Sequence, residues 1–445
     1  MAAAALGLLL AVGSGAAVAR AEDPFLRRTT TVRVVARVSP AVVNITTERL
    51  VSRSNPFQPF AGDPFFERFF RDFFEPRGPQ TSQNLGSGVL IDAEGHVLTN
   101  EHVVARASRI RVAVADGREF DATLIGADPN NDIAVLAVET DQKLPWIALG
   151  SSADLMVGEP VIAIGNPFGL SHTVTTGVIS ALDRSIRSDR RVFHGFLQTD
   201  ASINPGNSGG PLLNAAGELI AVNTAIYQNA QGIGFAIPID VARRIVEILI
   251  AQGEVSPVWL GLVLQELDGE LQALMKLPKG TSGALVNRVR EDSPASRAGM
   301  RRGDVVARLE RRPVRSARAF FEMLGGVTAD QQVEIEAWRD GVRETLRLRA
   351  EEAPKGLIDQ LVEEMLGMTL RPHEKGGYVV RSVRSGGGAQ RIGLRRGDLL
   401  LGINGRSLQD EEALRRSVLD LRGRPQALIV VQRGVGRYHV TIPLV

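Results

Sequence analysis

Cysteine is absent from the 445-residue chain, and histidine is scarce. Without cysteine the chain can form no disulfide, no thiolate metal site and no cysteine nucleophile. The six histidines include no pair at the His-x-x-x-His spacing that would support a zinc site. The sequence therefore predicts neither a metal nor a cofactor, and any chemistry must come from hydroxyls, carboxylates and single imidazoles.

A large excess of one charge is also lacking. The 52 Lys and Arg residues nearly balance the 50 Asp and Glu residues, so bulk charge does not favour a nucleic-acid partner. An apolar fraction of 44% and a charged fraction of 23% are typical of a soluble globular protein. The length suggests roughly two to four domains.

Long apolar runs are missing except at the N-terminus. Residues 1–12 are mostly apolar, small residues follow, and Ala19–Ala21 fits a signal-peptide cleavage site. We expect residues 1–21 to be a cleaved export signal, with an uncleaved anchor as the alternative. No other stretch approaches a membrane-spanning length, so we expect no stable membrane span in the mature chain.

Residues 22–85 form an irregular segment that is rich in phenylalanine. Phenylalanine pairs recur every four residues between Phe65 and Phe74, with charged residues between them. At helical spacing the pairs would form one aromatic stripe. Two interpretations stay open: the stripe is buried on its own domain, or it is a contact surface between subunits or over the active site.

Short β-rich runs separated by Gly, Asn and Asp turns follow from Gly86 to about Pro238. This spacing predicts an antiparallel β-barrel or sandwich rather than a βαβ fold. A helix is expected at residues 239–251, where Gly253 stops it. We expect the first domain to span residues 86–252.

The rest of the chain contains an internal repeat. Residues 295–306 (ASRAGMRRGDVV) match residues 389–400 (AQRIGLRRGDLL), each 94 positions later. Two copies of one module are therefore expected at residues 257–350 and 355–445.

A serine in a glycine-rich turn, Gly206–Gly210 (GNSGG), is the candidate nucleophile. Acyl transfer by serine needs an attacking hydroxyl, an imidazole base, a carboxylate that orients the imidazole, and N–H groups for the oxyanion. Glycine permits the tight backbone that aims successive N–H groups at one point. We assign Ser208 as the nucleophile and the amides of Gly206 and Ser208 as the oxyanion hole.

His102 and Asp132 are the candidate base and acid. His102 falls where a strand ends and a helical turn begins, and Asp132 opens an apolar strand, where a lone acid is costly to bury without a partner. A single His or Asp in such a position usually has only a structural role. The order His, Asp, Ser along a β-rich chain favours a catalytic role for all three residues. The other histidines fit less well: His96 follows a turn, His172 and His194 are expected in polar loops, and His373 and His439 lie in the repeats.

The segment GNSGG also satisfies the G-x-S-x-G nucleophile elbow of α/β-hydrolases. That fold requires the chain order Ser, acid, His. The only histidines after Ser208 lie in the repeated modules, and no βαβ alternation surrounds the motif. We therefore reject the interpretation of this segment as a nucleophile elbow.

The chain resembles the HtrA/Deg family of exported serine proteases. The resemblance rests on the repeat and on four segments: TNEHVV (99–104), NDIAVL (131–136), GNSGGPL (206–212) and GFAIP (234–238). Glu101 departs mildly from the family, which more often has Asn or Asp before the histidine.

The resemblance implies a mainly β fold, a chymotrypsin-like double β-barrel followed by two α+β PDZ domains. It further implies a periplasmic, ATP-independent endopeptidase that degrades unfolded or damaged envelope proteins, with chaperone activity as a second possibility of another class. A homotrimer or larger homo-oligomer is also implied.

Two sets of residues are expected to determine substrate specificity, one beside the nucleophile and one in the repeated modules. In trypsin-like members of the wider fold that the chain resembles, an acid six residues before the nucleophile attracts Lys or Arg. Here Ser202 stands at that position, and Ile203 and Ile226 are expected to line a small apolar pocket for Val, Ala or Ile. PDZ domains bind a peptide C-terminus by strand addition. The candidate carboxylate-binding loops contain Trp259, Leu260, Gly261 and Leu262 in the first module and Leu366, Gly367 and Met368 in the second. A scaffold or oligomer role is the alternative for these loops.

Overall fold

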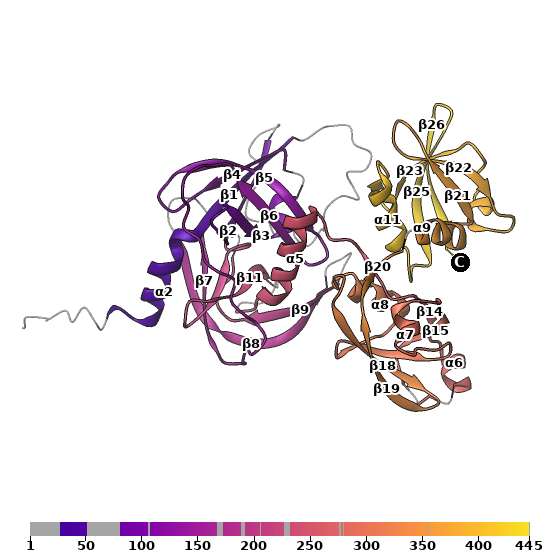
Figure 1. Cartoon of the computed structure of the whole chain (residues 1–445), viewed down its shortest axis with the longest axis horizontal. Helices are drawn as coiled ribbons and strands as arrows, with labels where there is room; N and C mark the ends of the chain where they lie inside the picture. The colour runs from indigo at the N-terminus through magenta and orange to yellow at the C-terminus, as the bar shows by residue number, and fades with distance from the viewer. Residues whose placement is uncertain are drawn as a thin grey trace, which may run out of the picture.

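The structure of the protein is a computed structural model (Figure 1). It describes residues 27–50, 81–105, 107–166, 172–187, 192–204, 206–226, 232–275, 277–278, 280–354 and 356–444. The expected signal peptide, residues 1–21, and the aromatic stripe, residues 65–74, lie outside the described residues. The described part contains two closed β-barrels followed by two open sheets with short helices, so the predicted mainly β fold class is confirmed.

The first barrel has six antiparallel strands in the order β1-β2-β3-β6-β5-β4. They are β1 (Val42–Leu50), β2 (Thr81–Leu90), β3 (His96–Thr99), β4 (Arg109–Ala113), β5 (Glu119–Asp128) and β6 (Ile133–Val138). Strand β1 closes the barrel because it pairs with β2 on one side and β4 on the other. The short helix α4 (Glu101–Val104) follows β3 directly. In β4 alternate residues, Ile110 and Val112, are buried, as a barrel strand with one interior face requires.

Helix α2 (Thr30–Val38) and a 3₁₀ turn (Ser39–Ala41) precede the first barrel. The Thr29 hydroxyl accepts a hydrogen bond from the Val32 amide and so caps the helix N-terminus. Val34 and Val38 are buried in the core between the barrels.

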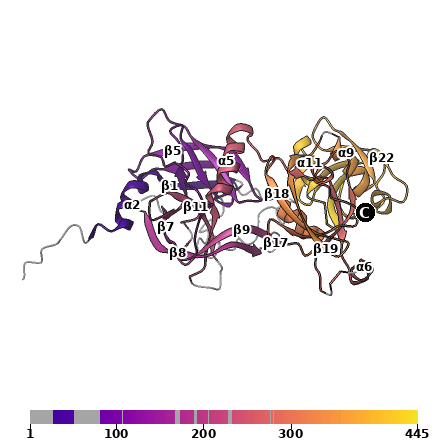
Figure 2. The same cartoon turned by 60° about the horizontal axis from the view of Figure 1, so that its bottom comes forward.

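The second barrel also has six antiparallel strands, in the order β10-β11-β12-β9-β8-β7. They are β7 (Pro160–Gly165), β8 (Thr173–Arg187), β9 (Val192–Thr199), β10 (Pro211–Asn214), β11 (Leu219–Ile226) and β12 (Gly234–Pro238). Figure 2 shows β8 and β9 reaching from this barrel toward the third domain. At that contact the Arg312 side chain donates to the Asp183 carboxylate at 2.8 Å.

Helix α5 (Ile239–Gln252) joins the two barrels, as the sequence predicted. It packs against β5 and β6 of the first barrel and against β11 and β12 of the second. Gly253 ends the helix in the left-handed conformation, with φ of 79°. One buried cluster contains Leu98 from the first barrel, Leu213 from the second and Ile245 from α5, so the barrels share a core.

The third domain is a sheet in the order β14-β15-β16-β18-β19 with three helices. Its strands are β14 (Leu262–Glu266), β15 (Ala284–Val289), β16 (Val305–Leu309), β17 (Arg312–Pro313), β18 (Gln332–Arg339) and β19 (Val342–Arg349), and a separate pair is formed by β13 (Val258–Trp259) and β20 (Glu351–Glu352). Its helices are α6 (Gly269–Leu274), α7 (Pro294–Arg297) and α8 (Ala317–Leu324). Strand β14 lies at the edge of the sheet.

The fourth domain repeats this arrangement in the order β21-β22-β23-β25-β26. Its strands are β21 (Met368–Pro372), β22 (Tyr378–Val383), β23 (Leu399–Ile403), β24 (Arg406–Ser407), β25 (Gln426–Arg433) and β26 (Gly436–Pro443). Its helical elements are α9 (Leu357–Leu361), a π-helical turn (Val362–Leu366), α10 (Gly388–Arg391) and α11 (Glu411–Leu419). Strand β21 occupies the edge position that β14 has in the third domain.

An ion pair with a buried aspartate occurs at the same place in both repeats. Arg339 donates to both oxygens of Asp304 at 2.7 and 2.6 Å, and Arg433 contacts Asp398 at the same two distances. Hydrogen bonds from Arg433 hold the pKa of the Asp398 carboxyl below its ordinary value. The aspartates belong to the repeated sequence motif, so the motif marks a structural ion pair in each domain.

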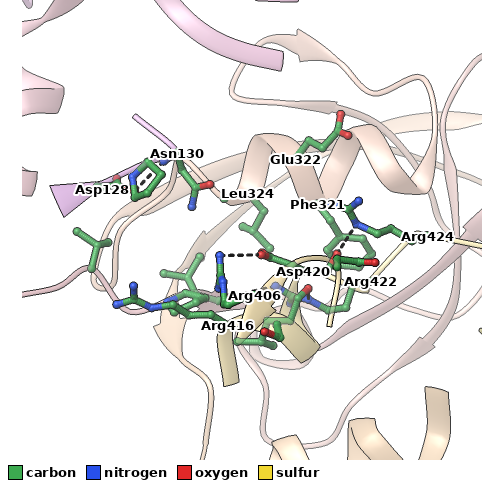
Figure 3. A pocket seen from close by; sticks show the side chains of 18 of the residues that line it. Asp128, Asn130, Phe321, Glu322, Leu324, Arg406, Arg416, Asp420, Arg422 and Arg424 are labelled. Carbon is green, nitrogen blue, oxygen red and sulfur yellow. Dashed lines mark hydrogen bonds and ion pairs between the residues drawn. The ribbon is translucent and has the colours of Figure 1, made fainter. Parts of the chain in front are cut away.

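A cavity of about 490 Å³ lies where the barrels and the two repeated domains meet (Figure 3). Asp128 and Asn130 line it from the first barrel, Phe321 from α8 and Arg422 from the fourth domain. The Arg422 guanidinium lies 4.8 Å from the centre of the Phe321 ring and donates to the Leu419 carbonyl at 2.9 Å. Burial lowers the pKa of Arg422 to about 10. The contact between Arg422 and Phe321 joins the fourth domain to the third.

None of the helices among the described residues is both long and apolar enough to span a membrane.

Candidate active site

His102 and Asp132 meet in the first barrel, at its border with the second. His102 lies in α4, directly after β3, and Asp132 precedes β6 by one residue. The His102 Nδ1 atom is 2.8 Å from each oxygen of the Asp132 carboxylate, and the His102 amide donates to the same carboxylate at 3.1 Å. Both side chains are buried, with 4% and 1% exposed. A carboxylate on Nδ1 places the ring hydrogen there and makes Nε2 the nitrogen that can accept a proton.

The chain before Asp132 explains its orientation. The Asp128 carboxylate accepts hydrogen bonds from the Asn130 amide at 3.0 Å and the Asn131 side chain at 2.6 Å, which forms an Asx turn. Asp132 then has φ of 56°, a left-handed conformation that Asp and Asn adopt more readily than other side chains. The Asn100 side chain donates to the Asp132 carbonyl at 3.0 Å. The polar run before β6 therefore turns the carboxylate toward His102.

Thr224, which sequence reasoning missed, links the two barrels at this site. It lies in β11, is fully buried, and its hydroxyl donates to the Asp132 carboxylate at 2.6 Å. Its carbonyl accepts a hydrogen bond from the Ser208 hydroxyl at 2.7 Å. A buried Asn-Thr pair in the otherwise apolar strand LIAVNTAI (219–226) is the sequence signal that could have revealed it.

Ser208 lies in the turn that leads into β10, on the second barrel, and is fully buried. The following residue, Gly209, has φ of 83°, and a Cβ atom there would lie 2.1 Å from the Ser87 carbonyl oxygen. Only glycine fits this conformation and this contact. A hydroxyl has one hydrogen to donate, and here the Ser208 hydrogen points to Thr224. Rotation about the Ser208 Cα–Cβ bond would direct it elsewhere.

The backbone of the turn leaves two amides available. The Asn207 amide donates to the Asn204 carbonyl at 2.9 Å, and the Gly210 amide donates to the Asn207 carbonyl at 3.0 Å. Within the part of the chain that the structure describes, neither the Gly206 nor the Ser208 amide donates to a protein acceptor. These are the two amides that the sequence assigned to an oxyanion hole.

Ile203 and Ile226 both adjoin Gly234 of β12. Ile226 pairs with Gly234 across the β11–β12 ladder. The Ile203 side chain is 2% exposed, and its Cγ1 lies 2.7 Å from the position that a Cβ on Gly234 would occupy. The structure therefore brings the two residues that were predicted to form an apolar pocket to one point on the second barrel.

The two predicted carboxylate-binding loops have equivalent positions in the repeated domains. Each precedes the edge strand of its sheet, and each glycine carbonyl accepts an amide hydrogen bond at 2.8 Å, Gly261 from Arg290 and Gly367 from Arg384. The loops differ in their surroundings. Trp259, at the start of the first loop, is buried in the same cluster as residues of the fourth domain.

His194 does not lie in a polar loop, as the sequence suggested, but within β9. Strand β9 begins at Val192 and continues through the histidine. The Nδ1 atom of His194 is 2.8 Å from the Ser185 hydroxyl. Burial and the nearby Arg312 cation lower the pKa of His194 to about 4.

No cluster of three or more His, Asp or Glu residues suited to a metal ion occurs among the residues that the structure describes. His96 contacts the Asp92 carboxylate at 2.6 Å, and the His172 Nε2 atom is 3.1 Å from the Val42 carbonyl. Among the His–Asp pairs of the described residues, the pair of His102 and Asp132 is the one that is linked through Thr224 to Ser208.

Comparisons with known protein families agree with this division of the chain. Residues 86–222 match a family described as a trypsin-like peptidase domain. Residues 258–349 and 379–433 each match a PDZ domain family. The two barrels are therefore chymotrypsin-like, and the repeated modules are PDZ domains.

Several known proteins are similar along most of this chain. A probable periplasmic serine endoprotease, DegP-like, from Ectopseudomonas mendocina (strain ymp) is 39% identical, with 90% of this chain and 91% of that protein covered. The protein of the same description from Halomonas elongata is 37% identical, with 92% of each covered. Among solved structures, the HtrA-type protease AlgW with a decapeptide is 39% identical with a TM-score of 0.50, covering 72% of this chain and 98% of that one.

Proposed function

Because the chain belongs to the HtrA-type, DegP-like family of serine endoproteases, we propose that it cuts unfolded or damaged proteins of the periplasm with Ser208 as its nucleophile. The observation that carries this proposal is the buried contact chain His102–Asp132–Thr224–Ser208, which joins an imidazole, a carboxylate and a hydroxyl across the two barrels. The name of the similar proteins supports the periplasmic location, together with the expected signal at residues 1–21.

In the proposed reaction, the Ser208 oxygen attacks the scissile carbonyl while His102 Nε2 takes its proton. Asp132 orients the imidazole and stabilises the imidazolium that forms. The amides of Gly206 and Ser208 donate to the oxyanion of the tetrahedral intermediate. His102 then gives the proton to the leaving amine, and water repeats the sequence on the acyl-enzyme.

The Ser208 hydroxyl has to rotate before the attack. In the structure it donates to the Thr224 carbonyl, whereas the reaction requires that the same hydrogen point to His102. The rotation costs one hydrogen bond of ordinary strength, about 1 kcal/mol net, so it is no large barrier.

We propose that Ile203 and Ile226 form a small apolar pocket, so that cleavage follows Val, Ala, Ile or similar residues. The support is their shared position beside Gly234 and the absence of an acid at Ser202. Digestion of a peptide library tests this, because preferred cleavage after Lys or Arg would contradict an apolar pocket.

The PDZ domains are proposed to bind peptide C-termini. Strands β14 and β21 lie at the edges of their sheets, so a peptide strand could add to either. The AlgW structures with a decapeptide and with a tripeptide support peptide binding by a similar chain. We place the PDZ domains at residues 257–350 and 355–445, after a protease domain at residues 86–252.

A homotrimer or larger assembly is also proposed, with the aromatic stripe, outside the described residues, as one contact. Mass measurement of a chain with Phe69, Phe70, Phe73 and Phe74 replaced by Ser tests the stripe, because an unchanged oligomer would exclude it.

The central experiment compares casein degradation by the wild type and by Ser208→Ala. We expect the variant to lose activity by roughly 10⁴-fold or more, because no other group replaces the nucleophile. Undiminished degradation would show that Ser208 is not the nucleophile. The same variant tests chaperone activity: suppression of casein or enzyme aggregation by Ser208→Ala would assign substrate binding to the chain independently of cleavage.

A further inference from the structure

Ser87, in β2 of the first barrel, makes two hydrogen bonds to the turn that carries Ser208 on the second barrel. Its amide donates to the Ser208 carbonyl at 2.9 Å, and its hydroxyl donates to the Gly206 carbonyl. Ser87 is fully buried, so water does not compete for either bond. No step of the proposed reaction uses this residue.

The Ser87 hydroxyl is itself fixed in direction. The Asn166 amide, at the end of β7, donates to the Ser87 oxygen at 2.7 Å, so the single hydroxyl hydrogen is directed to Gly206. The Asn44 side chain holds the Asn166 carbonyl at 2.7 Å, and the Thr99 hydroxyl donates to the Ser87 carbonyl at 2.7 Å. Every polar group of Ser87 therefore has a hydrogen-bond partner, and Ser87 itself lies in strand β2.

The turn fits closely against Ser87. A Cβ on Gly209 would lie 2.1 Å from the Ser87 carbonyl oxygen, and one on Gly210 would lie 3.3 Å from the Ser87 Cβ. Because neither β2 nor the turn can shift without a steric clash, the position of β2 fixes the position of the turn. The geometry of the turn thus depends on the first barrel as well as on its own sequence.

Gly206 needs such an external restraint. Its φ of 105° is open to glycine, but glycine also adopts many other conformations at similar cost. Rotation of the Gly206 backbone would turn its amide relative to the rest of the turn. A hydrogen bond to the Gly206 carbonyl limits that rotation.

We propose that Ser87 is a positioning residue for the oxyanion hole, which holds the Gly206 carbonyl and thereby keeps the Gly206 amide aimed at the developing oxyanion. This inference rests on the proposed function, because it assumes that the Gly206 and Ser208 amides form the hole. Ser87 touches neither substrate nor the reacting atoms. It acts only through the backbone of the turn.

The test compares Ser87→Ala with wild type and with Ser417→Ala, using a fluorogenic peptide that the wild type cleaves. Ser417 is a matched control, because it is a buried serine of α11 whose hydroxyl donates to a carbonyl, that of Ala413 at 2.6 Å, far from the turn. Loss of one oxyanion donor lowers kcat by about 10²–10³. Ser87 acts on the oxyanion hole only indirectly, through the backbone of the turn. We therefore expect kcat of Ser87→Ala to fall about 10- to 100-fold, with KM within about twofold of the wild-type value.

Two further measurements separate this role from a general loss of structure. A peptide boronate forms a tetrahedral adduct with an oxygen in the oxyanion hole, so its affinity should fall by a factor similar to that of kcat. The acid limb of the pH profile of kcat/KM should stay unchanged, because the contacts between His102 and Asp132 are intact. Ser417→Ala should leave kcat, KM and boronate affinity within about twofold of wild type.

A kcat for Ser87→Ala that matches the control would overturn the inference, as would a rise in KM at constant kcat. If Ser87→Ala melts below the assay temperature, Ser87→Cys replaces it, because the thiol leaves no cavity, is somewhat larger than the hydroxyl and is a much weaker hydrogen-bond donor. A folded Ser87→Cys with wild-type kcat would also overturn the inference. Ser208→Ala, assayed in parallel, tests the proposed function separately: an inactive Ser208→Ala beside a fully active Ser87→Ala means that only the role of Ser87 is wrong.

Discussion

The Thr224 hydroxyl donates a hydrogen bond to the Asp132 carboxylate at 2.6 Å, although the two residues belong to different barrels. Through its carbonyl the same threonine accepts the Ser208 hydroxyl. One residue of β11 therefore contacts both the proposed acid and the proposed nucleophile. The relative placement of the barrels is coupled directly to the geometry of the site.

Removal of the Thr224 hydroxyl should lower both the catalytic rate and the folding stability. In Thr224→Ala the Asp132 carboxylate loses a buried donor, which costs about 1–3 kcal/mol, and the orientation of His102 loosens. We expect kcat to fall about tenfold, measured on a peptide substrate. Thr224→Ser keeps the hydroxyl and is the matched control, so a Ser variant as slow as the Ala variant would contradict the hydrogen-bond explanation.

The sequence singled out His102, Asp132 and Ser208 as candidates because each stands in a short local motif. It could not reveal Thr224 or Ser87, because their partners lie about 90 and 120 positions away and depend on how each barrel closes. The strand order follows from hydrogen-bond register, which alternating apolar residues alone do not specify. The fold class was predictable from regular strand spacing and the repeat, whereas the contacts between barrels were not.

His194 should make folding stability depend on pH between about 6.5 and 4. In the folded chain, burial and Arg312 lower its pKa to about 4, while Asp183 opposes the shift. Over this range His194 is protonated in the unfolded chain but neutral in the folded chain. The folding stability therefore falls as the pH falls from 6.5 to 4. The loss amounts to on the order of 2 kcal/mol, because the side chain is not fully buried.

Urea unfolding at several pH values checks this expectation, with His194→Gln as the comparison. Glutamine has a similar size and does not titrate, so the variant should lose less stability than wild type between pH 6.5 and pH 4. Equal slopes for the two proteins would show that His194 is solvated in solution.

The repeated ion pair should matter more in the first PDZ domain than in the second. The Arg339 side chain is 15% exposed, whereas Arg433 is 45% exposed and therefore better screened by water. Asp304→Asn should raise hydrogen exchange in β15 and β16 roughly 100-fold, and Asp398→Asn should raise it in β22 and β23 roughly tenfold. Exchange measured by mass spectrometry on the full chain provides both values, and the reverse order would contradict the argument from exposure.

Trp259 should hold the two PDZ domains together. It belongs to the first domain but is buried in a cluster with Leu361 and Met365, next to an ion pair in which Arg290 contacts Glu364 at 2.6 Å. Trp259→Ala removes the largest apolar side chain of this contact. We expect small-angle scattering to show a larger radius of gyration for this variant.

Trp338→Ala is the control for that measurement, because Trp338 lies in β18 of the same domain beneath Arg343, at 4.6 Å. The control should scatter like the wild type. A Trp259→Ala chain that keeps the wild-type radius would show that the remaining polar contacts suffice.

The division of the site between two barrels also affects how the enzyme is made. A growing chain completes the barrel that carries His102 and Asp132 before the residues around Ser208 exist, and domains generally fold in the order of synthesis. In the proposed mechanism neither barrel can cut on its own, because the proposed base, His102, and the proposed nucleophile, Ser208, come from different barrels. We therefore expect the nascent chain to gain proteolytic activity only after both barrels have folded and docked.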